Sequence, residues 1–363
     1  MINTLGMGGA ERVATILTDR WARNGHEVHL LTTYGREVSS HHHLAESVRI
    51  HRLAEQLPHP RGTAATGWRK FSATVRLIRR ERFDCVCSFL VHVNVLAIMA
   101  AKACRVPVLV SERTFPPSHR IGKTLSFLRL WTYPLADYVV MQTEEGLQWL
   151  NIAIPRARGV VIRNPVEVPV PQTTSDALPD AILPVGCKLL LFVGRLSPEK
   201  RISSLIQAFA RAAADKPDWH FAILGDGPEK QALQSLVDEE RMGANIHLPG
   251  PVGDLDPWYR RADRFAFASL FEGFPNALAE AVCYGIPAMA IDCPTGPRDL
   301  LKHGTNGLLL PREADMDELA QGMAMLLNRD FPKAERHAWR LRRQLAPHSI
   351  ARDWLDLIER SQP

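Results

Sequence analysis

The second half of the chain alternates short apolar runs with longer segments that read as helices. The apolar runs are bounded by turn residues and have the length of buried strands; they cover residues 188–193, 220–224, 245–248 and 264–269. The segments at 202–214 and 229–240 read as helices between them. This alternation predicts parallel strands joined by helices, and therefore a doubly wound α/β domain.

The first half shows the same alternation, but it begins abruptly. A glycine turn at residues 6–11 is followed by apolar residues at helical spacing up to Gly25, and residues 28–33 then read as a strand. Later strands are expected at 48–53, 84–90, 106–111, 138–142 and 159–163. Only five residues precede the first glycine, so a strand feeding that turn would have to occupy residues 1–5 and barely fits.

A proline-rich segment separates the two halves. Residues 167–185 carry four prolines among Thr, Ser and Asp, which is typical of a linker. We therefore expect two domains, 1–165 and 166–348, each with a doubly wound sheet. A final helix within 349–363 could pack back on the first domain.

Composition limits the classes of protein that the chain can represent. With 363 residues, 46% hydrophobic and 23% charged, it is an ordinary globular sequence of about two domains. No apolar run approaches the roughly 20 residues of a membrane-spanning helix, and no secretory signal is evident at the start. The cytoplasm is the expected location, and the six scattered cysteines are expected to be reduced.

Charge is distributed unevenly. Residues 1–165 carry 22 Lys and Arg against 12 Asp and Glu, whereas the remainder is net negative. A basic first half suggests an anionic partner, although solvated charge without a partner also explains it. Residues 68–82 mix apolar and basic side chains as in a membrane-surface helix, and a core-packing helix with a basic outer face explains them equally well. No nucleic-acid recognition motif is present, so no nucleic acid is expected.

The stretch from Phe271 to Glu280 organises the candidate site. Glu272 follows the strand at 264–269, at the carboxyl edge where open α/β sheets bind ligands. A helix is expected to begin near Pro275, so its first amides could bind a phosphate, and Glu280 would lie about two turns along it. One acid before the helix and one on it would reach different parts of one ligand.

Other loops at the same sheet edge add complementary groups. Arg195 and Lys200 follow the strand at 188–193 and suit a diphosphate. Gly225 and Gly227 permit close approach of a flat ring, although ordinary turns explain them too. Asp254 and Asp256 read as a turn and helix cap and not as a metal site.

A dinucleotide cofactor is the obvious alternative for the first glycine turn. It predicts an acidic residue at the end of the second strand, where this chain has Thr32 and Thr33. The sequence therefore disfavours a dinucleotide.

These motifs resemble the retaining glycosyltransferases of family 4. The resemblance rests on Gly194-Arg195 with Lys200, on residues 225–229 and on residues 272–280, and it covers nearly the whole chain. Residues 111–116 and 292–297 are similar to a branch that builds bacterial surface polysaccharides and lipid-linked oligosaccharides. The resemblance implies the GT-B fold, two Rossmann-like domains facing across a cleft, with the first strand here short or missing.

The resemblance also implies roles for individual residues. Glu272 would bind hydroxyls of the donor sugar and Glu280 the ribose, while Arg195 and Lys200 would hold the diphosphate and stabilise the leaving nucleotide without a metal or other cofactor. Further donor contacts are implied for Gly8, Gly9, Gly194, Gly225, Gly227, Leu248, Gly250, Gly273, Phe274, Pro275, Asn276, Ala277 and Leu278. Many members carry a histidine near Glu112 and Arg113, so these two residues and His92 are the candidates for sugar or acceptor contacts in the first domain.

The implied activity is transfer of a hexose or N-acetylhexosamine from a nucleotide diphosphate sugar, with UDP favoured over GDP, to a hydroxyl of a glycan. The acceptor is expected to be polyprenyl-diphosphate-linked, at the inner face of the plasma membrane, where a basic first domain would attract anionic lipid. Two alternatives stay open: a nucleotide-sugar epimerase on the same architecture, and a binding protein without turnover.

Overall fold

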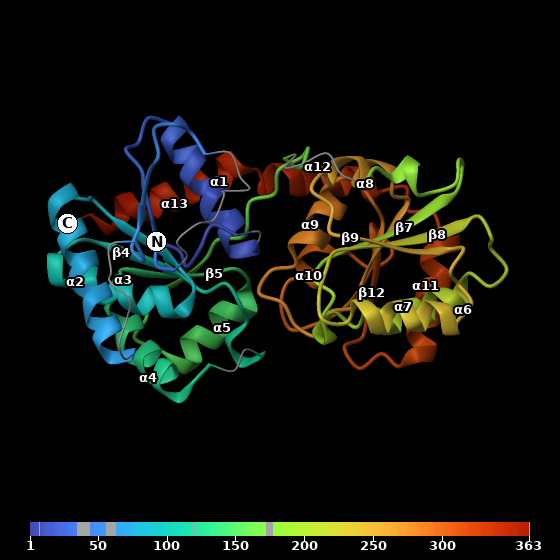
Figure 1. The fold of residues 1–363 in the computed structure, drawn as a ribbon, viewed down its shortest axis with the longest axis horizontal. Coiled ribbons are helices and arrows are strands. Elements are labelled where there is room, and N and C mark those ends of the chain that lie inside the picture. The colour runs from blue at the N-terminus through green and yellow to red at the C-terminus, as the bar shows by residue number, and fades with distance from the viewer. Residues whose placement is uncertain (7, 35–43, 56–62, 119–120, 172–176, 363) are drawn as a thin grey trace. The chain divides into compact units, whose positions relative to one another are not determined.

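The computed structural model describes residues 1–6, 8–34, 44–55, 63–118, 121–171 and 177–362. The chain forms two compact units, Met1–Pro165 with Leu345–Pro363, and Val166–Gln344 (Figure 1). The boundaries predicted above are 165/166 and 348/349, and the units change at 165/166 and 344/345. Both units consist of parallel strands joined by helices, which confirms the predicted α/β class. The acceptor and donor roles assigned to the two domains stay predictions.

The described residues of the second unit form a six-stranded parallel sheet. Its strands lie in the order β12-β11-β10-β7-β8-β9. They are β7 (Lys188–Val193), β8 (Trp219–Leu224), β9 (Ile246–Gly250), β10 (Arg264–Phe267), β11 (Ala288–Ile291) and β12 (Gly307–Leu310). From β7 the chain moves outward to β9 and then returns to β10 on the other side of β7. The sheet therefore has its switch point between β7 and β10, where open α/β sheets bind ligands.

Helices cover this sheet and enclose a continuous apolar core. They are α6 (Ile202–Ala212), α7 (Lys230–Glu239), α8 (Asp256–Arg261), α9 (Asn276–Cys283), α10 (Pro297–Leu300), α11 (Met316–Asn328) and α12 (Ala334–Gln344), with 3-10 turns η3 (Pro179–Ala181) and η4 (Pro198–Lys200). Side chains of β7 and β8, such as Phe192 and Phe221, pack against α6 and α11 and are fully buried. This core holds the carboxyl ends of the strands rigidly in place.

The first unit carries its strands in two separate groups. β1 (His29–Thr32) pairs with β2 (Arg49–Arg52), and a second sheet has the order β3-β4-β5-β6. The latter strands are β3 (Val86–Phe89), β4 (Val108–Ser111), β5 (Tyr138–Met141) and β6 (Gly159–Val161). All pairs are parallel. The expected strands at 28–33, 48–53 and 84–90 are therefore confirmed in slightly shorter form.

The first residues of the chain connect these two groups. The amide of Ile2 donates to the carbonyl of Leu31 at 3.0 Å, and the amide of Thr33 donates to the carbonyl of Ile2 at 3.0 Å. On the other side, the amide of Phe89 donates to the carbonyl of Met1 at 3.1 Å. The strand expected at residues 1–5 is thus reduced to a single bridge between Ile2 and Thr32, in agreement with a short first strand.

Helices pack on both faces of the first unit. They are α1 (Gly9–Arg23), α2 (Thr63–Glu81), α3 (Val91–Cys104), α4 (Lys123–Thr132), α5 (Glu144–Ala153) and α13 (Pro347–Ser361), with 3-10 turns η1 (Pro116–Ser118) and η2 (Tyr133–Leu135). Among the described residues, no helix has the length and apolar character needed to cross a membrane.

The last helix belongs to the first unit. α13 lies beside α1 (Figure 1), and the rings of Trp21 and Trp354 meet edge to face with their centroids 6.3 Å apart. The indole of Trp21 also donates to the carbonyl of Ala351 at 3.2 Å. Trp354 is 1% exposed, so α13 forms part of the core of this unit.

Candidate active site

The candidate site lies at the switch point of the second unit, where Lys200 and Glu272 meet. Lys200 ends the turn η4 after β7, and Glu272 follows β10, the strand next to β7 in the sheet. The ammonium of Lys200 donates a short hydrogen bond to the carboxylate of Glu272. Both side chains are mostly buried, so the pair is an ordered ion pair with limited screening by water.

The loops that carry this pair are tied to each other. The amide of Leu270 donates to the carbonyl of Glu199 at 2.8 Å, and Thr295 donates from its hydroxyl to the carbonyl of Glu272. Ser197 donates to the carboxylate of Glu199 at 2.6 Å. Burial raises the pKa of Glu199, but the hydrogen bonds from Ser197 and from backbone, with the nearby charges of Lys200 and Arg195, outweigh it and leave that pKa lowered. Arg195 is exposed and lies in the same loop as Ser197 and Glu199, after β7.

Glycines allow the loops after β7, β8 and β9 to interlock. A Cβ on Gly225, which has φ +141°, would lie 1.9 Å from the carbonyl oxygen of Gly194. A Cβ on Gly227 would lie 2.2 Å from the carbonyl oxygen of Leu196. The amide of Gly225 donates to the carbonyl of Gly250 at 2.9 Å. Backbone contact, and not turn flexibility alone, therefore explains why glycine stands at 225 and 227.

The start of α9 lies at the same edge. The helix begins at Asn276, whose amide donates to the carbonyl of Phe274 at 3.0 Å, and the N-cap residue, Pro275, makes no side-chain capping hydrogen bond. Helix amides without a capping side chain bind anions well. Gly296, with φ +96°, packs against the ring of Pro275 and so fixes this start.

Glu280 lies just over one turn along α9, nearer its start than the two turns expected. Its carboxylate accepts from the hydroxyl of Tyr259 at 2.8 Å, and it is 3% exposed. The ring of Tyr259 stacks on Tyr284 at 5.1 Å between centroids, and Tyr284 donates to Asp256. Burial and this bond raise the pKa of Tyr284, so its hydroxyl stays protonated.

The sequence did not identify the two tyrosines that hold Glu280 in place. Tyr259 lies on α8 and Tyr284 follows α9, and both read from the sequence as ordinary apolar positions. Ser197 and Thr295 were also missed, because the sequence shows them only as polar residues of loops. The one available signal was Asp256 near Asp254. Asp254 accepts from the amide of Asp256 at 3.1 Å, which confirms the predicted turn before α8. The predicted helix cap is wrong, because the N-cap residue is Leu255 and it makes no side-chain capping hydrogen bond.

In the first unit, the glycine turn leads directly into α1. Gly8 precedes the helix and Gly9 is its first residue. The carboxylate of Glu11 folds back over Gly8 and accepts from the hydroxyl of Thr4 at 3.1 Å. Sequence reasoning did not select Glu11, although an acid in the first turn after paired glycines was a readable signal.

Glu112 and Arg113 are both buried in the first unit and have different direct polar partners. Glu112, 1% exposed, accepts from the hydroxyl of Tyr133 at 2.7 Å and faces Arg129 at 3.6 Å. Burial raises its pKa against these partners. Arg113 donates to Asn164 at 2.7 Å, and burial lowers its pKa to about 9. Their predicted contacts with a sugar or acceptor stay predictions, and both side chains already have protein partners.

His92 is more accessible than these two residues. It lies at the start of α3, and its Nε2 is 3.1 Å from the amide oxygen of Asn3. The first-unit candidates are therefore distributed over the ends of several strands and helices.

The second-unit candidates lie on adjoining loops at one sheet edge. Lys200, Glu272 and the glycine loops are joined by hydrogen bonds or direct contact, and Gly273 to Leu278 lead from Glu272 into α9. Phe274 and Leu278 are buried, so these two residues can offer only backbone groups to a ligand. Leu248 lies within β9, in agreement with the strand expected at 245–248, and this strand extends further than expected, through Gly250. The arrangement combines a cation, a carboxylate, helix amides and small loops, which suits a phosphorylated sugar.

Known proteins match both units. Residues 7–168 match the family described as Glycosyltransferase Family 4, and residues 179–343 match the family described as Glycosyl transferases group 1. An exopolysaccharide phosphotransferase of Streptomyces coelicolor is 32% identical over 64% of this chain, which spans only 24% of that protein's length.

Other similarities extend over the whole chain. The GalNAc-α-(1→4)-GalNAc-α-(1→3)-diNAcBac-PP-undecaprenol α-1,4-N-acetyl-D-galactosaminyltransferase of Campylobacter jejuni is 25% identical, over 99% of this chain and 97% of that protein. The solved structure of HepE from Anabaena in complex with UDP has a TM-score of 0.78 at 16% identity, and covers 99% of this chain and 98% of that chain. Because the two family matches cover both units and the fold agrees, the chain belongs to the family 4 glycosyltransferases with the GT-B fold.

Proposed function

We propose that the protein transfers a hexose or N-acetylhexosamine from a nucleotide diphosphate sugar to a hydroxyl of a glycan, with retention of configuration. The Lys200–Glu272 ion pair at the switch point carries this proposal. A cation there can neutralise the diphosphate as charge develops on the leaving nucleotide, and the carboxylate can accept hydrogen bonds from sugar hydroxyls. With Lys200 in this role, the reaction needs no metal ion.

The donor and acceptor are proposed from the comparisons. The Anabaena structure contains UDP, which favours a UDP-sugar over a GDP-sugar here. The Campylobacter relative is named for an undecaprenol-diphosphate-linked substrate, which favours a polyprenyl-diphosphate-linked acceptor in surface polysaccharide synthesis.

Transfer of radiolabelled sugar to a lipid-linked acceptor tests the ion pair. We expect Lys200→Ala and Glu272→Gln each to reduce kcat/KM by about 10²-fold or more, because each removes an interaction with developing charge or with the sugar. Lys188→Ala is the matched control, because Lys188 lies at the opposite end of β7, where it pairs with Asp218 at 2.9 Å. Unchanged turnover in both site variants would refute the assignment.

Further measurements distinguish a retaining transferase from an epimerase and from a binding protein without turnover. Proton NMR of the product from an α-linked donor should show an α-linkage, and turnover should persist in chelator. Conversion of the donor without acceptor would instead indicate an epimerase. Donor binding by calorimetry with neither transfer nor hydrolysis would indicate a binding protein.

We further propose that the protein docks on the anionic inner face of the plasma membrane through α4. This helix exposes Phe127, Leu130 and Trp131, which are 56%, 45% and 68% exposed and lie at helical spacing, with the rings of Phe127 and Trp131 5.6 Å apart. Exposed aromatic residues of this kind favour a membrane interface.

Basic charge lies in the same helical layer. α4 contacts α3, and α3 contacts α2, which exposes Arg76, Arg79 and Arg80 and, nearer its start, Trp68. Such charge attracts anionic lipid. The structure thus keeps a core-packing face on α2 and shows an exposed apolar cluster on α4, which sequence reasoning did not select.

Vesicle flotation tests this docking. The wild type should float with vesicles that contain phosphatidylglycerol and less with phosphatidylcholine alone. A Phe127→Ser, Trp131→Ser double variant should lose most of this binding, whereas Ile152→Ser, a change at an 82% exposed apolar residue of α5, should not. Equal flotation of both variants would contradict the proposal.

A further inference from the structure

Two tyrosines connect the short helices α8 and α9 beside the candidate site. Tyr259 on α8 donates from its hydroxyl to Oε2 of Glu280 on α9 at 2.8 Å. Tyr284, the residue after α9, donates from its hydroxyl to Oδ1 of Asp256, the first residue of α8. The two rings stack with their centroids 5.1 Å apart. Each helix therefore holds a carboxylate of the other, and the four residues form a closed ring of contacts.

The hydroxyl of Tyr284 also accepts a hydrogen bond. The amide of Val170 donates to it at 2.9 Å. Burial opposes the ionisation of Asp256, but hydrogen bonds from Arg260 and Tyr284 outweigh burial and lower the pKa of the Asp256 carboxyl. Asp256 is therefore an ionised acceptor and fixes the direction in which the Tyr284 hydroxyl donates. The oxygen lone pairs of that hydroxyl remain for the amide of Val170.

Val170 belongs to the proline-rich segment 167–185, which the sequence predicts as a linker. It is 5% exposed and so is packed against the second unit. Further along the segment, the carbonyl of Ala177 accepts from the indole of Trp258, on α8, at 2.9 Å. The described part of the segment is therefore attached both to α8 and to the end of α9.

The chain just before this segment is attached to the first unit instead. The side-chain oxygen of Asn164 accepts from Arg113 and from Gln142, each at 2.7 Å. Asn164 and Val170 lie in different units. The stretch between them is therefore held by one unit at Asn164 and by the other at Val170, and a displacement of Val170 acts directly on the Tyr284 hydroxyl.

We propose that Tyr284 is a positioning residue that couples the attachment of the linker at Val170 to the orientation of the Glu280 carboxylate. Binding of a nucleotide through its ribose at Glu280 then stabilises the hydrogen bond from Val170 to Tyr284, and this bond in turn strengthens nucleotide binding. The coupling rests on the proposed function, because it requires a nucleotide whose ribose contacts Glu280.

The coupling acts in both directions and by the same factor, as binding equilibria that influence each other must. α8 and α9 have six and eight residues, so tertiary contacts and not helix length fix their positions. A ribose that orders Glu280 therefore orders Tyr259 and α8, and through Asp256 it orders Tyr284. Loss of the Tyr284 hydroxyl should weaken nucleotide affinity for the same reason.

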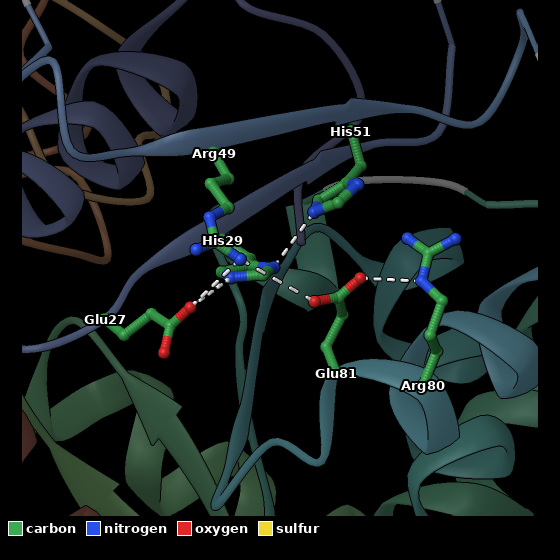
Figure 2. A network of polar contacts seen from close by, with 6 residues as sticks. All are labelled: Glu27, His29, Arg49, His51, Arg80 and Glu81. Atoms are coloured by element: carbon green, nitrogen blue, oxygen red, sulfur yellow. Dashed lines mark hydrogen bonds and ion pairs between the residues drawn. The ribbon is translucent and has the colours of Figure 1, made fainter.

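A polar network in the first unit provides a matched control. Figure 2 shows six residues of that unit joined by hydrogen bonds and ion pairs: Glu27, His29, Arg49, His51, Arg80 and Glu81. The Nδ1 of His29 is 2.9 Å from the Nε2 of His51, and the two rings stack at 5.0 Å between centroids. His51→Phe keeps a stacked ring and removes this polar contact, as Tyr284→Phe does in the second unit.

Amide hydrogen exchange at Val170, with and without saturating UDP, tests the coupling. In the wild type, UDP should slow this exchange by about fivefold or more, because the hydrogen bond to Tyr284 opens less often. The amide of Asn245, which donates to the carbonyl of Met242 at 2.9 Å just before β9, is the internal reference and should change much less. Tyr284→Phe should exchange faster at Val170, lose the effect of UDP there and bind UDP about fivefold more weakly in calorimetry.

Tyr259→Phe distinguishes coupling from a purely structural role of Tyr284. This change leaves the hydrogen bond between Val170 and Tyr284 intact and keeps the stacked ring. It should nevertheless remove the effect of UDP on Val170, and without nucleotide it should speed exchange there by about threefold. His51→Phe should behave like the wild type in each of these measurements.

Two results would overturn the coupling. One is UDP that binds in calorimetry without slowing exchange at Val170, and the other is a Tyr259→Phe variant whose exchange at Val170 equals that of the wild type with and without UDP. Failure of the proposed function has a different signature. A wild type that binds neither UDP nor GDP would contradict the proposed donor, and exchange in nucleotide-free Tyr259→Phe would still decide whether Glu280 and Tyr284 are coupled.

Discussion

The two units hold their glycine loops in different ways. In the second unit, Gly194 follows the six-residue strand β7, and its carbonyl packs directly on the backbone of Gly225. In the first unit, Gly8 follows a single bridge at Ile2, and the group packed over it is the flexible side chain of Glu11. A loop fixed by backbone packing tolerates little change, whereas a loop covered by a side chain can adjust. The loop of the second unit should therefore be the more rigid of the two.

Substitution of the two glycines gives the largest contrast. Gly225→Ala should destabilise the second unit by about 3 kcal/mol or more, because the new Cβ meets a backbone oxygen and φ is positive. Gly8→Ala should lose less than about 1 kcal/mol, because the Glu11 carboxylate can move aside. Urea unfolding measures both, with Gly243→Ala as the control, since a Cβ there has no neighbour within 4 Å. Similar losses at Gly225 and Gly8 would break the comparison.

Trp354 anchors α13 in the core of the first unit. Its removal tests how much the stability of this unit depends on packing by the last helix. Trp354→Ala should cost about 3 to 5 kcal/mol, because it leaves a void beside Trp21 in the core. Unfolding followed by fluorescence would measure this loss in the free energy of unfolding. Trp339→Ala is the matched control, since Trp339 on α12 is 55% exposed. A small effect of Trp354→Ala would show that α13 is dispensable.

The buried amino group of Met1 makes stability depend on pH. Its pKa is about 6 in the folded state against 8.0 in the unfolded chain, so the unfolded chain binds more protons between these values. The free energy of unfolding should therefore rise from pH 6 to pH 8, by at most about 3 kcal/mol, and its contribution is complete above pH 8.

Acetylation of that amino group provides the comparison. The acetylated amino group cannot take up a proton. The free energy of unfolding of the acetylated chain should therefore lose the pH dependence that comes from Met1 and keep the pH dependence that comes from histidines. Urea unfolding at both pH values measures the difference. Identical slopes for the free and acetylated chains would mean that the amino group is hydrated in the folded state.

The smallest expected effect concerns the support of Glu280. Tyr259→Phe removes the hydroxyl that donates to this carboxylate at 2.8 Å but keeps the stacked ring. We expect a loss of about 1 kcal/mol in stability and a weaker affinity for donor, since Glu280 loses its orientation. Calorimetric titration with UDP measures the affinity. Tyr138→Phe in β5 of the first unit is the control and should leave donor affinity unchanged.

Much of the fold follows from the apolar pattern. The expected strands at 188–193, 220–224 and 264–269 correspond to β7, β8 and β10, because buried parallel strands are short apolar runs with clear boundaries. The first sheet was harder to predict, since residues 1–5 lack the length of a strand. Its division into two groups depends on pairings between residues far apart in sequence.

The charged residues of the candidate site were predicted from the sequence, but the residues that hold them in place were not. Lys200 and Glu272 stand out because charged residues follow apolar strands, whereas their direct contact depends on β7 lying next to β10. Tyr259 and Tyr284 carry no sequence signal that separates a supporting role from core packing. Glu112 was selected through the family resemblance, near a position where many members carry a histidine, and only the structure shows that this residue is 1% exposed.

The position of α13 has a consequence for the order in which the chain folds during synthesis. Residues 166–344 of the second unit are all made before α13 leaves the ribosome. The first unit, although most of it is synthesised first, cannot complete its core until Trp354 has been made, after the whole second unit. Multidomain proteins usually fold from the amino end as they are synthesised. In this chain, the last packing step of the first unit instead follows the synthesis of the second unit. The half of the enzyme made earliest is the one that matures last.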